Sequence, residues 1–463
     1  MPSKQPLIFL SYRRGDAQTA LEELYSVLRN KYGEDGVFRD TSTIRAGTKY
    51  PPALRSKLHE ADAVLLVIGP GWIREARHGE LDWVVEEAAL ALKNPKTRIF
   101  PVLVDGARFP VDALPPRILG VKDWQSFSLR PAHFRADALR LLRALPQPVP
   151  DAAITVAHVG RLKKIDSRQQ QTDGVSVLAW APDGKALISG GEDGSVGWWK
   201  GQTVRSKPAH SSSVRHVAFA SDRKWMFSLS CDALRVWTHP GGTLQEETKL
   251  SFDEGRTFSM AASPVDPIFV VGAIGKDPEI YTVPDAAWCD PLPDRSLSSR
   301  LRLRWPPPKP FLATALAFSP DGRVVAAGSL DGSVWLWTIA DRTLLWKKRL
   351  AKTCVVALVF SPAGAHIASA SDGQVCVYNL DGSALLQQEV DGPVKGVAFS
   401  PDGNLLACAL EKGAMMFLDL AACSSVAGPL PRPTGALAVA ISPDGTRLAV
   451  GLPNGVVELW GID

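Results

Sequence analysis

The chain of 463 residues has few cysteines and little net charge. All of its cysteines fall in the second half, and none belongs to a Cys-x-x-Cys pair: Cys231, Cys289, Cys354, Cys376, Cys408 and Cys423. This spacing argues against a zinc site or a redox motif and predicts buried thiols in a reducing compartment. A net charge of +4 is small for this length, so we expect no binding to nucleic acid.

Long apolar segments are also absent. The longest run, Ala63–Gly69, has the length of a buried strand and is too short to span a bilayer. Residues 1–16 hold only a short apolar run before two arginines, which is not the pattern of a secretory signal. We therefore expect a cytoplasmic protein that does not cross a membrane. Its length predicts more than one domain.

Residues 1–146 alternate short apolar strands with helical segments. The strands are expected at Leu7–Leu10, Gly36–Asp40, Ala63–Gly69 and Arg98–Asp105. Continuous aliphatic strands separated by helices predict a parallel sheet that is covered on both faces. Ligands of such sheets bind at the carboxyl ends of the strands. Here those ends carry Ser11–Arg14, Asp40, Gly69–Trp72 and Asp105.

A different pattern begins after Pro146. Residues 147–152 form a linker, and residues 153–463 repeat one phrase seven times, mostly about forty residues apart. The copy at 314 reads TALAFSPDGRVVAAGSLDGSVWLW. Each copy predicts three short strands joined by tight turns, and such units must stack radially to bury their faces. The first turns contain Asp183, Asp321, Asp402 and Asp444, which we expect to be turn residues rather than metal ligands.

The repeats resemble those of WD-repeat β-propellers. The spacing from aspartate to aromatic residue is kept in Asp193–Trp199, Asp331–Trp337 and Asp372–Tyr378. The Gly-His dipeptide of that family is mostly missing, and Ala209-His210 is the nearest match. The resemblance implies a seven-bladed propeller over residues 153–463.

Two segments of this region do not follow the repeat. The last repeat ends after its third strand, and Ile154–Ile165 is expected to supply the missing outer strand and close the ring. In Ser299–Pro310, arginines alternate with leucines. That segment predicts either an outer strand with a solvated basic face or a ridge that docks a partner.

One helical run, Glu80–Lys93, carries a candidate for chemistry. Trp83 and Glu87 lie one turn apart, and we expect both on the side away from the apolar stripe. An aromatic residue facing away from the core is typical of a site or an interface, although a glutamate there is commonly only a solvated charge. Glu86 projects to the opposite flank and should be expendable. The stripe consists of Leu81, Val84, Val85, Ala88 and Leu92.

The first 146 residues resemble a TIR (Toll/interleukin-1 receptor) domain of the kind found in bacterial multidomain proteins. The matching pieces are FLSYRR, VFRDTSTIRAGTKY, ADAVLLVIGPGWI and WVVEEA. The resemblance implies a flavodoxin-like α/β fold. Members of the family include NAD⁺ hydrolases, cyclases and non-catalytic adaptors. By this resemblance Glu87 is the catalytic glutamate and Trp83 is its aromatic partner.

The same resemblance assigns the residues that bind the substrate. Tyr12, Arg13 and Arg14 would face the nucleotide, while Asp40 and Tyr50 would border the pocket. The two arginines either grip the pyrophosphate or pair with acids such as Asp40 or Asp16. NAD⁺ enters as the substrate, and no resident cofactor or metal is expected.

These features predict an NAD⁺ hydrolase, which releases nicotinamide and either ADP-ribose or a cyclic ADP-ribose. A carboxylate close to the ribose would stabilise its oxocarbenium-like transition state. The propeller would bind a trigger or a protein partner and control the self-association of TIR domains, in the setting of bacterial antiviral defence. The alternatives are a non-catalytic scaffold for protein–protein interaction and an enzyme whose cyclic product signals to another protein.

Overall fold

The computed structural model of the chain divides into two compact units, Met1–Pro148 and Val149–Asp463, and each is described by itself. None of the helices in the described ranges is long and apolar enough to span a membrane. The structure describes residues 6–13, 15–39, 52–72, 82–94, 97–110, 114–123, 126–146, 153–201, 203–220, 225–238, 244–248, 257–265, 268–273, 279–282, 313–339, 343–412, 415–426 and 435–462.

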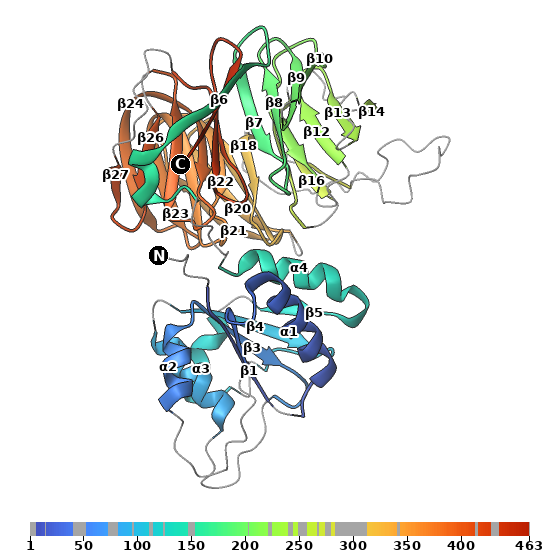
Figure 1. The fold of residues 1–463 in the computed structure, drawn as a ribbon, viewed down its shortest axis with the longest axis vertical. Coiled ribbons are helices and arrows are strands. Elements are labelled where there is room, and N and C mark those ends of the chain that lie inside the picture. Colours follow the sequence, from blue (N-terminus) through green and yellow to red (C-terminus); the bar gives the residue numbers. More distant parts are fainter. Residues whose placement is uncertain are drawn as a thin grey trace. The chain divides into compact units, whose positions relative to one another are not determined.

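A five-stranded parallel sheet forms the centre of the first unit (Figure 1). Its strand order is β2-β1-β3-β4-β5, so β1 lies between β2 and β3. The parallel sheet and its first four strands are confirmed. The short fifth strand was not predicted, because three residues are too few to show a period. The strands are β1 (Ile8–Tyr12), β2 (Val37–Arg39), β3 (Ala63–Ile68), β4 (Arg98–Val104) and β5 (Phe127–Leu129).

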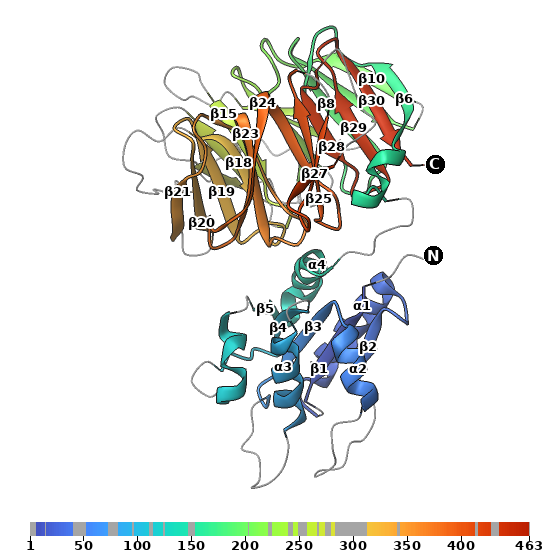
Figure 2. The same ribbon diagram turned by 90° about the vertical axis from the view of Figure 1, so that its left-hand side faces the viewer.

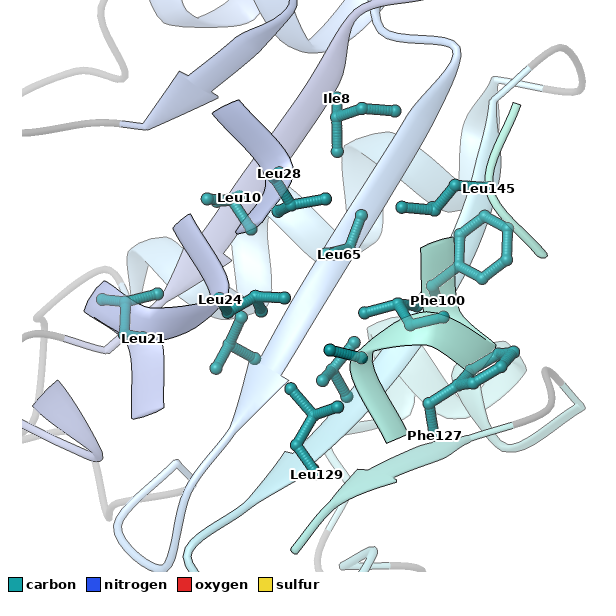
Figure 3. Packing of buried hydrophobic residues seen from close by; sticks show 14 of the residues in the cluster. Ile8, Leu10, Leu21, Leu24, Leu28, Leu65, Phe100, Phe127, Leu129 and Leu145 are labelled. Atoms are coloured by element: carbon teal, nitrogen blue, oxygen red, sulfur yellow. The ribbon is translucent and has the colours of Figure 1, made fainter. Parts of the chain in front are cut away.

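Helices cover both faces of this sheet (Figure 2). On one face, α1 (Gln18–Tyr32) and α4 (Phe134–Ala144) enclose an aliphatic core, in which leucines of α1 meet Leu10, Leu65 and Phe100 (Figure 3). The apolar spacing of Leu21, Leu24 and Leu28 gives α1 this buried side. The other face is covered by α2 (Pro52–Glu60), α3 (Trp83–Lys93) and the 3-10 segment η2 (Pro116–Asp123).

The second unit consists of antiparallel sheets. Its repeats begin with β7 (Val175–Trp180), β8 (Ala186–Gly191), β9 (Ser195–Lys200), β10 (Thr203–Pro208), β11 (His216–Phe219), β12 (Trp225–Leu229), β13 (Leu234–Thr238), β14 (Leu244–Thr248), β15 (Thr257–Ala262), β16 (Ile268–Ala273) and β17 (Glu279–Thr282). They continue with β18 (Ala313–Phe318), β19 (Val324–Ser329), β20 (Ser333–Thr338), β21 (Leu344–Arg349), β22 (Val355–Phe360), β23 (His366–Asn379), β24 (Ala384–Phe399), β25 (Leu405–Leu410), β26 (Met416–Asp419), β27 (Ser424–Val426), β28 (Ala438–Ile441), β29 (Arg447–Gly451) and β30 (Val456–Gly461).

The first strands of successive repeats contact one another in a closed circuit, so the unit is a β-propeller. Strand β7 contacts β11, and the contacts continue through β15, β18, β22, β24 and β28 back to β7. The sequence predicts separate sheets for seven repeats, but the described residues form six sheets. The reason is that β24 is continuous: its first half pairs with β23 and its second half with β25, which joins two repeats in one sheet.

In three of the described repeats the first turn is held by a bond between its own serine and aspartate. In the copy at 314, Ser319 Oγ donates to Asp321 Oδ1 at 2.6 Å, and the amide of Val324 donates back to Ser319 Oγ at 2.9 Å. Gly322 adopts φ +72°, a conformation that favours glycine. Ser442 and Asp444 form the same bond at 2.5 Å. These aspartates are turn residues, as predicted.

The ring closes with a strand from the beginning of the unit, as predicted, but this strand lies later in the chain than the expected Ile154–Ile165 and overlaps it only at residues 163–165. Strand β6 (Lys163–Gln169) pairs antiparallel with β30 and completes the last sheet. Ile154, expected in that strand, is fully buried in an apolar cluster, and its amide donates to the carbonyl of Gly445 at 2.7 Å. The expected closing segment was therefore about nine residues too early at its start. Residues 299–310 lie outside the described ranges.

Candidate functional site

The helix α3 holds Glu87 on its buried side. Glu87 is only 6% exposed, and it lies next to Val84 and Ala91 on the helix, which are also buried. Three residues of an α-helix correspond to about 300°, so Glu87 stands roughly 60° from Val84. The prediction that Glu87 lies on the side away from the apolar stripe is therefore wrong. The carboxylate is at the edge of the face that packs toward the sheet.

Several predicted site residues lie outside the described part of the chain. Arg14, Asp40 and Tyr50 fall in the undescribed ranges, and so does the loop Ile44–Tyr50. Trp83 is the first residue of α3, but its side chain is outside the description. Of the predicted set, only the side chains of Tyr12, Arg13 and Glu87 can be placed.

Arg13 makes structural contacts at the carboxyl edge of the sheet. Its Nε donates to the carbonyl of Trp72 at 2.7 Å, and its Nη2 donates to Asp82 Oδ2 in an ion pair. Both side chains are mostly buried, with 19% and 15% exposed. Arg13 thus makes a structural ion pair, one of the two alternatives from the sequence, and its partner is Asp82 rather than Asp40 or Asp16.

Asp82, the partner of Arg13, was not predicted from the sequence. This residue is the N-cap of α3, and its Oδ1 accepts from the amide of Val84 at 3.2 Å. Aspartate directly before a helical run is a common N-cap signal, which could have identified this role. Its bond to Arg13 could not be foreseen, because 69 residues separate the two.

Tyr12 and Ser11 point to opposite faces of the sheet. Side chains alternate along β1, and Tyr12 packs with Ile8 and Leu10 on the face covered by α1 and α4. Ser11 therefore shares the other face with Phe9, and α3 covers that face. Ser11 is fully buried on the face of the sheet that α3, the helix of Glu87, covers. Tyr12 lies on the opposite face.

Three buried polar atoms at this edge have no hydrogen-bond partner in the described part of the chain. They are Ser11 Oγ, Asp16 Oδ2 and Trp72 Nε1. Each such group costs about 1–3 kcal/mol, so few are tolerated in a native core. They come from β1 and from the segments that follow β1 and β3, and flavodoxin-like sheets bind ligands at the carboxyl ends of these two neighbouring strands.

The segment Gly69–Gly71 leaves β3 in a turn. The amide of Trp72 donates to the carbonyl of Gly69 at 3.1 Å, and the amide of Gly71 donates to Asp16 Oδ1 at 3.1 Å. The Gly71 amide is thus used by the protein itself, and the turn joins the loop after β1 to the loop after β3.

Glu86, the neighbour of Glu87 that was expected to be expendable, forms an ion pair. Its Oε2 accepts from Arg117 Nη2 at 2.6 Å. Arg117 is 58% exposed, so the pair contributes at most about 1 kcal/mol. Among the described residues, no group of three or more His, Cys, Asp or Glu side chains is arranged to hold a metal.

The propeller contains a buried polar network in its second repeat. His210 Nδ1 lies 2.7 Å from Asp232 Oδ1, and its Nε2 lies 2.8 Å from Ser228 Oγ. Because a carboxylate only accepts, Nδ1–H donates to Asp232. Trp237 Nε1 donates to Ser228 at 2.8 Å and completes the network.

Burial would by itself raise the pKa of Asp232. Hydrogen bonds from the Ser211 amide and from His210 outweigh that effect and hold the pKa of Asp232 below its ordinary value. In the first repeat a glutamine replaces the histidine: Gln171 Nε2 donates to Ser189 Oγ at 2.6 Å. The near match Ala209-His210 thus forms the Asp–His network, although most repeats lack the dipeptide.

Comparison with known families identifies both units. The TIR domain family matches residues 8–143, so the first unit is a TIR domain. The WD domain, G-beta repeat family matches 162–200, 201–238, 304–338, 348–379 and 385–415. The chain is thus a TIR domain followed by a WD-repeat propeller. Five repeats match this family where seven were expected; the copies at 259 and 436 are not matched.

The curated relatives match only part of this chain. Pre-mRNA-processing factor 19 homolog 2 of Arabidopsis thaliana is 25% identical over 45% of this chain and 38% of its own length. SEC12-like protein 2 of Arabidopsis thaliana is 26% identical over 42% and 48%. Small ribosomal subunit protein RACK1 of Brassica napus is 27% identical over 32% and 39%. The chain spans less than half of the length of each of these relatives.

Proposed function

We propose that the TIR domain cleaves NAD⁺, with Glu87 as the catalytic carboxylate. The observation that carries this proposal is the burial of Glu87, which is only 6% exposed although it lies at the edge of the packed face of α3. A surface glutamate would be solvated, whereas a carboxylate removed from water interacts strongly with a developing positive charge. Ser11 Oγ, Asp16 Oδ2 and Trp72 Nε1, which have no partner among the described residues, add support, since such groups cluster at functional sites.

The chemistry needs one carboxylate at this place. Breaking the N-glycosidic bond releases neutral nicotinamide and leaves an oxocarbenium-like ribose. Glu87 would stabilise that charge and bind the sugar hydroxyls. The leaving group is already cationic in NAD⁺, so no general acid is required. Water or a nitrogen of the adenine ring then attacks the ribose carbon, which gives ADP-ribose or a cyclic ADP-ribose.

Substrate contacts are proposed for Trp83, Arg14, Asp40 and Tyr50. Trp83 would form an apolar wall beside the nicotinamide ring. Arg14 is the remaining guanidinium for the pyrophosphate, because Arg13 is engaged with Asp82 and the Trp72 carbonyl. In this proposal the two alternatives from the sequence are divided between the arginines, with structural pairing for Arg13 and pyrophosphate binding for Arg14.

The propeller is proposed to have seven units and to control the association of TIR domains. What supports seven is the closed circuit of first strands, which passes through the copies at 259 and 436 as well as the matched repeats. A trigger or partner bound by the propeller would release or assemble TIR domains. We propose a cytoplasmic role in bacterial antiviral defence, and the described cysteines, all unpaired, agree with a reducing compartment.

The test is nicotinamide release from NAD⁺ by concentrated full-length protein, followed by chromatography. Glu87→Gln keeps the size of the side chain and removes its charge, and it should lower release by about 100-fold or more. Glu86→Gln is the matched control on the same helix turn and should keep full activity. Release by Glu87→Gln at the wild-type rate would remove the assignment.

The second candidate is a non-catalytic scaffold, favoured by the engagement of Arg13 in structural contacts. In this case the TIR domain serves self-association and the propeller captures a protein. Wild-type protein that associates in light scattering, yet releases no nicotinamide at any concentration, would select the scaffold.

A further inference from the structure

Asp82 joins two parts of the TIR domain with its two carboxylate oxygens. Oδ1 accepts from the amide of Val84 and caps α3, while Oδ2 accepts from Arg13. The amide of Glu86 also donates to the backbone carbonyl of Asp82 at 3.0 Å. The first turn of α3 is therefore built around this one residue.

Arg13 holds the other side of the junction. It directly follows β1, and its Nε bond to the Trp72 carbonyl ties it to the loop after β3. One guanidinium thus fastens the ends of two neighbouring strands to the beginning of a helix. A planar guanidinium can bond two acceptors in fixed directions, which an ammonium group cannot do.

We propose that Arg13 and Asp82 form a positioning pair that sets the place of Glu87. The proposal rests on the proposed NAD⁺ cleavage. Glu87 is one turn beyond the first residue of α3, so a shift or rotation of the helix start moves its carboxylate by a similar amount. Displacements near 1 Å can cost up to about 100-fold in rate. Neither Arg13 nor Asp82 touches the substrate.

The competing role for Arg13 is binding of the pyrophosphate, and the two roles predict different kinetics. A positioning residue changes kcat and leaves KM nearly constant. A residue that binds the ground state and the transition state equally well lowers KM, so its replacement raises KM. Replacing Asp82 also distinguishes the two roles. Only in the positioning role does the effect of replacing Arg13 depend on whether Asp82 is present.

The experiment measures nicotinamide release by full-length protein with Arg13→Lys, Asp82→Asn and the double variant. Arg13→Lys keeps the charge but cannot span both acceptors. Asp82→Asn keeps the helix cap, since asparagine caps as well as aspartate, but loses the ion pair. Each single variant should lower kcat by about tenfold to 100-fold with KM within about twofold, and the double variant should equal the worse single variant.

Two further variants separate the pair from general effects on α3. Asp82→Glu keeps the charge for Arg13 and weakens the cap, so it should retain more activity than Asp82→Asn. Arg117→Gln breaks the ion pair with Glu86 on the same helix and should leave kcat unchanged. A raised KM in Arg13→Lys with normal Asp82→Asn would overturn the proposal, as would losses that add in the double variant.

A second measurement does not depend on catalysis. Hydrogen exchange at the amides of Val84 to Glu87 should become faster in Arg13→Lys and Asp82→Asn but not in Arg117→Gln. If the wild-type protein releases no nicotinamide, the proposed function fails and this exchange pattern still decides whether the pair holds the helix. Unchanged exchange in both variants would overturn the pair itself.

Discussion

The carboxylate of Asp16 occupies the space beside Gly69 that a side chain would need. A Cβ added to Gly69 would stand 2.5 Å from Asp16 Oδ2 and 2.6 Å from its Cγ. Asp16 also accepts from the amide of Gly71, so the two loops at the carboxyl edge of β1 and β3 meet through this contact. Their close approach depends on glycine at this position.

Gly69→Ala should destabilise the TIR domain by about 1–3 kcal/mol, because the added methyl group overpacks a buried position. The measurement is the denaturant midpoint of the helical circular dichroism signal, since all described α-helices belong to the first unit. Glu23→Ala is the control in the same unit: this residue of α1 is exposed, and its replacement should change the stability by no more than about 0.5 kcal/mol. A Gly69→Ala midpoint equal to that of the wild type would contradict the contact.

His210→Ala should destabilise the propeller, because it leaves Asp232 and Ser228 without their shared partner in a buried site. Asp232 keeps its hydrogen bonds from Ser211. Ser228 keeps the bond from Trp237. The loss of unfolding free energy should therefore be about 1–3 kcal/mol in total. Calorimetric unfolding of full-length protein measures it. His210→Gln is the informative comparison, since Gln171 bonds Ser189 at the corresponding place of the first repeat. Equal losses for the two variants would show that the bond to Ser228 contributes little.

The propeller should lose stability as the pH falls from the ordinary aspartate pKa, about 4, toward the lowered pKa values of three of its aspartates. Burial opposes ionisation of Asp193, Asp232 and Asp444, but hydrogen bonds from neighbouring serine and threonine residues outweigh it and lower the pKa of each. The unfolded chain then binds more protons than the folded one as pH falls below about 4, so stability is lost through the lowered folded pKa values.

The check is the thermal midpoint of the propeller between pH 6 and pH 2. We expect a plateau above about pH 5 and a fall below about pH 4. Asp232→Asn should lower the plateau and reduce the slope of the fall. A midpoint that rises with acid, or a slope that is the same in this variant, would refute the assignment.

The strands and turns were predictable because their signals are local. Continuous aliphatic residues in Ala63–Ile68 read as a buried strand, and all six are buried. The Ser-Pro-Asp-Gly turns carry their own bonds, as between Ser319 and Asp321. The six-stranded sheet was not predictable, since nothing in the local pattern shows that β24 continues from one repeat into the next.

The orientation of Glu87 is the main error at the site. A helical projection places residues around an axis but does not say how wide the buried face is. Around the helix axis, the buried face of α3 includes Ala88, Ala91 and Glu87. It is this wide because the sheet and η2 both pack against α3. Burial on two sides widens the face beyond the aliphatic stripe that the projection identifies.

The sequence alone determined the two architectures, the TIR and WD-repeat motifs and the turn chemistry, since each of these follows from residues within a few positions of one another. The tertiary structure decided that Arg13 pairs with Asp82, that Ser11 rather than Tyr12 faces the side of α3, and that β6 closes the ring. These relations join residues far apart in the chain, and hydrogen-bond partners across such distances are set by how the elements pack together.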